Sequence, residues 1–335
     1  MCWAASGLEQ QLFSLTEELP MNTAPVLIQR FGSLPGRGSP MPGACREVAM
    51  PLLRGLTELV QARSEDHKIL RATIIEEADS GDLFWLQAWL DLVSVPPTVS
   101  KGGRPLEPSL DDPHVGSGAL NYACQVLALI ARGDEEVVSA LHKVNVLSAV
   151  GARLLQGTQA KPDEQVTAWF PFATSAVLLI DALVGEEDLD RHTISNPSLF
   201  IPVWTRYHRP EDAAKGCLAA LERSLQQEAF TGASQLQISA LRALRHLARL
   251  SEAQATRIVR SRAPEWGLQV LQLAGLDEEA TVAALEFLLE VSRRDLRLVP
   301  VVAGEAAKAA SEKLPRSEEV ANLAAKVMAA TKKGY

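Results

Sequence analysis

The chain has 335 residues, enough to bury a sizeable core as one elongated domain or as two compact ones. With 47% hydrophobic and 22% charged residues it is not a disordered chain, and its many Leu and Ala residues with only 5% aromatics favour helix over sheet. A formal net charge of −8 argues against a general binder of nucleic acid or anionic membranes, because such proteins need a basic surplus to displace counterions.

Residues 1–93 are predicted to form an N-terminal helical region. A loop rich in Gly and Pro interrupts this region at 33–44, and helices are expected over 45–78 and 82–94. The first residues lack the charged start and the long apolar core of a signal peptide. No apolar run approaches the ~18 residues that cross a bilayer, so the sequence predicts no membrane span.

Residues 94–118 are predicted to form a flexible loop, because Pro97 and Pro105 exclude a continuous helix there. The helical pattern then strengthens, and no segment shows the sustained alternation of a half-buried strand. The predicted fold class is therefore all-α. Helical stretches are expected over 119–132, 133–157, 164–185, 211–229, 233–250, 252–274, 277–294, 296–313 and 316–332.

An irregular insertion at 186–210 breaks this rhythm, because Asn196 and Ile201 precede prolines that force extended or turn conformations. Its segment LFIPVWTRYHRP carries Phe200, Trp204 and Tyr207 among prolines and basic residues. Tyr, Trp and Arg dominate the energetics of protein interfaces, so these three aromatics are candidates for a protein-binding loop. The alternative is a plug that folds back onto the helices.

Three segments align on their own letters: ACQVLALIAR (123–132), ALRALRHLAR (240–249) and ALEFLLEVSR (284–293). Each is followed by a polar turn and another helix. On these residues the stretch 119–332 resembles the armadillo/HEAT-like helical-repeat superfamily. The resemblance implies a right-handed superhelical α-solenoid in which each repeat buries the apolar face of its neighbour and a concave groove runs along the stack.

One of the aligned helices carries the candidate site. Its basic residues Arg242, Arg245, His246 and Arg249, here called the basic stripe, recur at helical spacing opposite the leucines. The resemblance implies that this helix lines the groove, where planar guanidinium groups could bind the carboxylates of an acidic peptide or helix. The alternative is a solvated face balanced by neighbouring acids. The aligned positions for Arg242 and His246 are Gln125 and Leu129 in one repeat and Glu286 and Glu290 in another, so a groove of mixed charge is expected.

No local motif indicates catalysis, a cofactor or a metal site, and none of these is expected. The four cysteines lie too far apart in sequence for a CxxC-type zinc pair. Cys124 and Cys217 sit within apolar helical patterns and are predicted to be buried thiols. Cysteine usage favours a reducing compartment, which predicts the cytoplasm, with the nucleus as the alternative.

These patterns predict a non-catalytic protein-interaction scaffold or adaptor that binds a partner segment along the concave groove. The expected partners are proteins, with an acidic peptide or helix as the specific candidate, and no nucleic acid. A structural subunit of a large multiprotein assembly is the alternative. An enzyme with a site assembled across the groove is a further one.

Overall fold

In the computed structural model, the chain forms two compact units, residues 1–183 with 203–208 and residues 184–202 with 209–335. Predictions for 1–63, 81–97 and 186–209 lie outside the described residues, and with them Phe200, Trp204 and Tyr207. The structure describes residues 64–80, 98–99, 105–106, 118–143, 146–158, 166–185, 210–226, 233–295, 299 and 302–333.

The all-α prediction is confirmed for the described residues, with one small exception. Within the stretch predicted as a loop, strand β1 (Thr98–Val99) pairs antiparallel with strand β2 (Pro105–Leu106), and Thr98 lies opposite Leu106. Every other regular element in the described part of the chain is a helix.

The first unit contains α4, α7, α8, α9 and α10, and α8 lies at the centre of their contacts because it packs against α4, α7 and α9. Two polar contacts connect α10 to α7 and α8. Ser175 Oγ donates to Asn121 Oδ1 of α7 at 2.5 Å, and His142 Nε2 of α8 lies 2.9 Å from the Leu183 carbonyl oxygen. The bounds are Ser64–Ser80 for α4, Gly118–Ala131 for α7, Glu135–Lys143 for α8, Val146–Thr158 for α9 and Val166–Val184 for α10.

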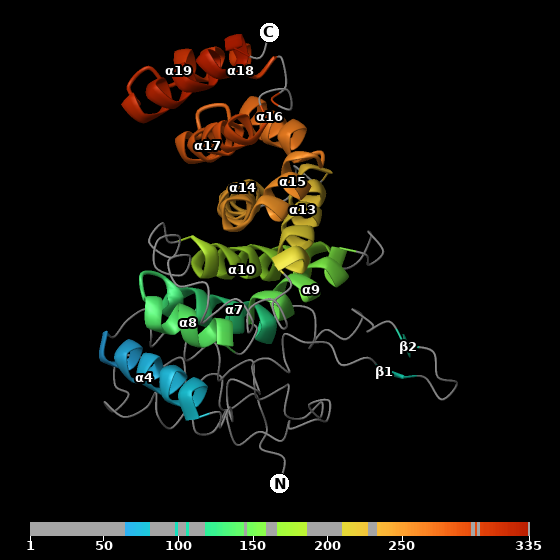
Figure 1. The fold of residues 1–335 in the computed structure, drawn as a ribbon, viewed down its shortest axis with the longest axis vertical. Coiled ribbons are helices and arrows are strands. Elements are labelled where there is room, and N and C mark those ends of the chain that lie inside the picture. The colour runs from blue at the N-terminus through green and yellow to red at the C-terminus, as the bar shows by residue number, and fades with distance from the viewer. Residues whose placement is uncertain are drawn as a thin grey trace. The chain divides into compact units, whose positions relative to one another are not determined.

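The second unit is built as two layers of helices (Figure 1). Helix α14 packs on α17, and α17 packs on α19; in the other layer α13 contacts α16, and α16 contacts α18. The layers join through the pairs α13–α14, α16–α17 and α18–α19. The bounds are Pro210–Gln226 for α13, Ala233–Leu250 for α14, Glu252–Val259 for α15, Ala263–Leu273 for α16, Glu278–Arg294 for α17, Ala303–Lys313 for α18 and Glu318–Lys333 for α19.

Local sequence explains where these helices begin. The side chains of Ser251, Asp277 and Ser317 accept hydrogen bonds from backbone N–H groups three residues later, which satisfies donors that the first turn leaves unpaired. The helical stretch predicted over 252–274 divides into α15 and α16, because Pro264 lies in the first turn of α16 and a proline lacks the N–H that would continue the preceding helix.

The core of the second unit lies between its layers, where α14 and α17 bury their leucines. Phe287 is among the largest fully buried side chains in the described residues. A Cβ atom at Gly267 of α16 would lie only 2.9 Å from Phe287 Cδ1, so a glycine is needed for this close helix–helix approach.

Candidate protein-interaction surface

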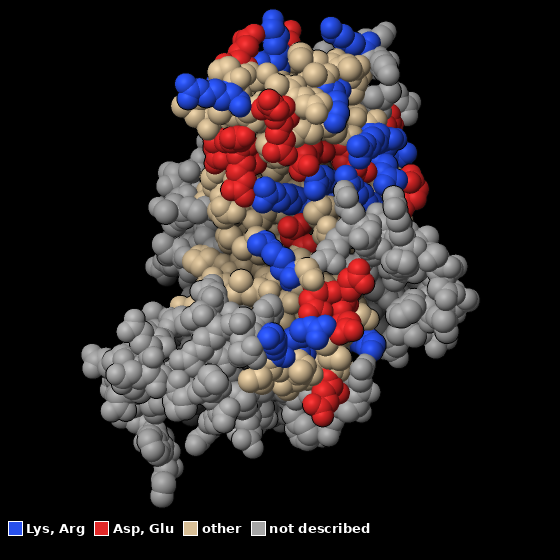
Figure 2. Space-filling view, turned by 90° about the vertical axis from the view of Figure 1, so that its left-hand side faces the viewer, with Lys and Arg blue, Asp and Glu red and all other residues tan. Residues whose placement is uncertain are grey.

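The basic stripe lies along the partly exposed side of α14, as its spacing predicts. Leu241, Leu244 and Leu247 are fully buried, whereas Arg245 and Arg249 keep intermediate exposure. The neighbouring helix in the same layer is α17. Figure 2 shows blue and red side chains side by side on this face of the second unit, which is the mixed charge that the aligned repeats predict.

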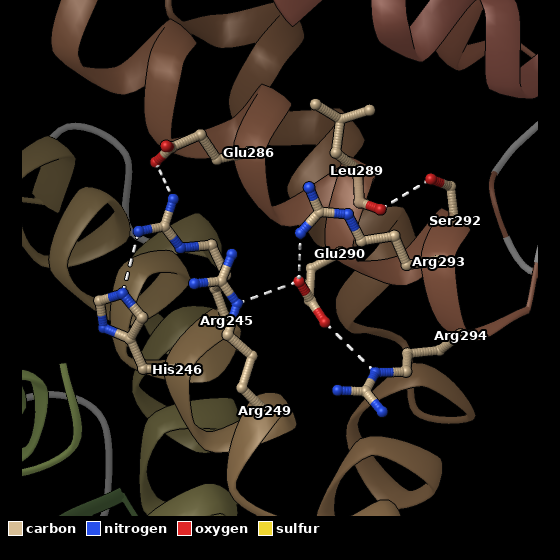
Figure 3. Close-up of polar contacts among 9 residues, drawn as sticks. All are labelled: Arg245, His246, Arg249, Glu286, Leu289, Glu290, Ser292, Arg293 and Arg294. Carbon is tan, nitrogen blue, oxygen red and sulfur yellow. Dashed lines mark hydrogen bonds and ion pairs between the residues drawn. The ribbon is translucent and has the colours of Figure 1, made fainter. Parts of the chain in front are cut away.

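The first two arginines of the stripe each meet a glutamate of α17. Arg242 Nη1 donates to Glu279 Oε1 at 2.9 Å, and Arg245 forms an ion pair with Glu286 (Figure 3 shows the second pair). Arg245 Nη2 also donates to His246 Nε2 at 2.9 Å. A guanidinium can only donate, so this bond requires the imidazole to carry its proton on Nδ1.

The third arginine belongs to a larger cluster around Glu290, whose side chain is only 4% exposed. Glu290 Oε2 accepts from Arg249 Nε at 3.1 Å and from Arg293 Nη1 at 3.2 Å, and its Oε1 accepts from Arg294 Nε at 3.2 Å (Figure 3). Arg294 also forms an ion pair with Glu252 at 3.3 Å. Both oxygens of the buried carboxylate are therefore hydrogen-bonded to cations.

The electrostatics of Glu290 reflect two opposing effects. Burial of the carboxyl acts to raise its pKa, because a charged group is less stable away from water. Hydrogen bonds and charges of Arg249 and Arg294 act in the other direction and outweigh burial, so the pKa lies below its ordinary value of 4.5. The carboxylate therefore stays ionised at neutral pH and holds its arginines in place.

The structure thus brings the basic stripe together and sets its three arginines against glutamates of the next helix in the layer. We call the pairs Arg242–Glu279, Arg245–Glu286 and Arg249–Glu290 the charged ladder. Sequence reasoning noted that Glu286 and Glu290 stand at positions aligned with the stripe, but it did not identify them as partners of its arginines. The sequence signal for this pairing was that ALEFLLEVSR (284–293) carries glutamates where the aligned ALRALRHLAR (240–249) carries basic residues.

The remaining chemistry of the described residues is sparse. No group of three or more His, Cys, Asp or Glu side chains in this part of the chain is placed to hold a metal ion. Cys124 and Cys217 are buried cysteines in the thiol form, which confirms their prediction. Burial raises the pKa of Cys124 to about 12, so this thiol remains protonated and unreactive. None of the described helices is both long enough and apolar enough for a membrane span.

Comparison with known proteins does not assign the chain to a family. No family model matches the sequence, and no curated protein is significantly similar to it. Among solved structures, the crystal structure of an engineered protein matches 94% of this chain and 98% of its own chain, with a TM-score of 0.49 and 16% sequence identity.

Proposed function

We propose that the chain is a non-catalytic protein-interaction scaffold, an α-solenoid of armadillo/HEAT-like repeats that binds a partner segment along the layer formed by α14, α17 and α19. The two-layer packing of the second unit supports this, since each helix pair rests on the next pair along the chain. In repeat proteins of this kind, stacking leaves one layer available as an extended binding surface.

The observation that carries the proposal is the charged ladder. Its outer pair is open to solvent, because the side chains of Arg242 and Glu279 are 34% and 50% exposed. Among the described residues, Arg242 donates only to Glu279 and only through Nη1, whereas a guanidinium has five N–H donors. The fork can therefore take a second carboxylate from a partner while it keeps Glu279, and an acidic peptide or helix fits this chemistry.

Comparative affinity purification from cells that express the chain tests this function. The informative variant is the charge swap Arg242→Glu/Glu279→Arg, which keeps the pair but inverts the pattern that a partner meets. A matched control is the swap Lys308→Glu/Glu312→Lys on α18, an exposed pair of the other layer whose Nζ and Oε1 atoms lie 3.8 Å apart. Melting temperatures of both variants are compared with that of the wild type before any capture.

We expect the wild type and the α18 swap to capture the same protein partner. The α14–α17 swap should bind this partner at least about tenfold more weakly, which corresponds to about 1.4 kcal/mol of binding free energy. If every partner survives the α14–α17 swap at equal melting temperature, the ladder is a structural feature of the layer and not a binding surface.

A further inference from the structure

A second surface of the same unit lies where the first turn of α14, the last turn of α16 and the start of α17 meet. They enclose an open pocket of about 270 Å³. Its apolar wall comes from Val270, Leu273 and Ala280, and its polar residues include Gln237 and Asp277. All of these residues belong to the second unit.

Two leucines extend the apolar wall to the outside. Leu273 is 48% exposed and Leu276 is 76% exposed, and they are two of the three large apolar side chains exposed in the described part of the chain. The turn between α16 and α17 presents them, because Gly275 has a φ of 60° that other residues rarely adopt. An exposed apolar patch that polar residues surround commonly marks a surface that another protein covers.

The wall of the pocket also carries a hydrogen-bond acceptor, the side-chain amide oxygen of Gln237. Gln237 is only 7% exposed, and its Nε2 donates to the Ser224 carbonyl oxygen at 3.4 Å. None of the described residues donates a hydrogen bond to its Oε1, although Gln237 lines the pocket. A ligand that brings an N–H donor into the pocket can hydrogen-bond to this oxygen, because an amide oxygen accepts hydrogen bonds.

The charge at the mouth of the pocket determines which charge the ligand should carry. Asp277 lines the pocket, and the exposed residues Glu278 and Glu279 follow it directly at the start of α17. Arg242 neutralises one of them, Glu279, while Asp277 and Glu278 accept hydrogen bonds from the neutral hydroxyl groups of Ser234 and Ser317. The mouth therefore keeps an excess of negative charge.

We propose that this pocket binds a basic segment of a protein partner that inserts one apolar side chain. The apolar side chain lies against Val270 and Leu273, an N–H of the segment donates to Gln237 Oε1, and flanking Lys or Arg residues face Asp277 and Glu278. This partner has the opposite charge to the one proposed for the charged ladder. The two surfaces are tested separately, because no variant below alters Arg242 or Glu279.

A random peptide library displayed on phage and selected against the full chain tests the pocket. Selection runs in parallel on the wild type, on Leu273→Ser/Leu276→Ser and on Glu278→Lys. Val302→Ser is the matched control, because Val302 is also 48% exposed but directly precedes α18 and does not line the pocket. Equal melting temperatures establish that the variants are folded.

We expect wild-type selections to enrich peptides with an apolar residue flanked by Lys or Arg. Synthetic copies should bind at least tenfold more weakly to the double-serine variant and more weakly to Glu278→Lys, with Val302→Ser unchanged. Raising the salt concentration should weaken their binding, because the charges at the mouth are exposed. Enrichment of neutral or acidic peptides, peptides indifferent to the double-serine change, or no enrichment would overturn the proposal. So would concentration-dependent self-association that Leu276→Ser abolishes, since a second copy would then occupy the pocket.

Discussion

Each of the two units contains a cluster in which one charged side chain binds several side chains of the opposite charge. The central side chain is positive in the first unit and negative in the second. In the first unit a single arginine, Arg71 of α4, binds the carboxylates of Asp134 and Glu136 at the start of α8. In the second unit a single carboxylate, Glu290, binds arginines 249, 293 and 294. The central groups differ most in exposure, which is 37% for the Arg71 side chain and 4% for that of Glu290.

This difference decides how much each cluster contributes to stability. Water can replace a lost partner of Arg71, so removing one of its ion pairs changes little. Water reaches Glu290 poorly, and removing its charge takes a counter-charge away from partly buried arginines such as Arg249. The buried cluster should therefore respond strongly to substitution and the exposed one weakly.

The substitution Glu290→Gln should have the largest effect, because it removes the charge and keeps the size of the side chain. We expect the free energy of unfolding to fall by about 2 kcal/mol, in the range of hydrogen bonds to charged groups. Denaturant unfolding followed by circular dichroism measures this change. Glu279→Gln is the matched control, since its single pair with Arg242 is exposed and should cost less than about 1 kcal/mol. Equal losses for the two variants would contradict the importance of burial.

The substitution Asp134→Ala should have the next largest effect, for a reason that does not involve Arg71. Asp134 Oδ1 accepts the Val137 N–H at 3.1 Å and so caps α8. Loss of such a cap costs about 1 kcal/mol, within a range of 0.5–2 kcal/mol. Asp134→Ser keeps a capping oxygen and removes only the charge, so it should retain most of the stability. If Ser costs as much as Ala in denaturant unfolding, the ion pair with Arg71 is the main contribution.

Lowering the pH should reveal how much the ionised Glu290 contributes to the free energy of unfolding, without a substitution in the cluster. The folded-state pKa of Glu290 lies below its ordinary value of 4.5, so its contribution is complete above about pH 4.5 and is lost as the pH falls through the folded-state pKa. The difference in unfolding free energy between wild type and Glu290→Gln should therefore be constant at neutral pH and shrink in acid. Unfolding of both proteins across this range measures it, and a difference that grows in acid would contradict the sign.

The helices of the second unit could be predicted more closely than their charge pairs. The expected stretch 233–250 matches α14 from Ala233 to Leu250, because helical periodicity and the serine that follows as the next cap are local signals. Periodicity also predicted which side of α14 is polar, but it does not tell which helix lies opposite. Arg249 and Glu290 are 41 residues apart with two helices between them, so their pairing depends on the stacking of α17 onto α14.

The smallest effect is expected for Arg71→Gln in the first unit. The side-chain hydrogen bond with Asp134 is the main cause that raises the pKa of Arg71, followed by the bond with Glu136. The Arg71 side chain is 37% exposed and that of Glu136 is 69% exposed, so solvent reaches the arginine and one of its two partners. Without the arginine, Asp134 keeps its hydrogen bond to the Val137 N–H, and water can solvate the exposed Glu136. The melting temperature of Arg71→Gln should therefore stay closer to wild type than that of Asp134→Ala. A larger drop for Arg71→Gln would mean that the arginine holds α4 onto α8, and the contrast between an exposed and a buried cluster would then fail.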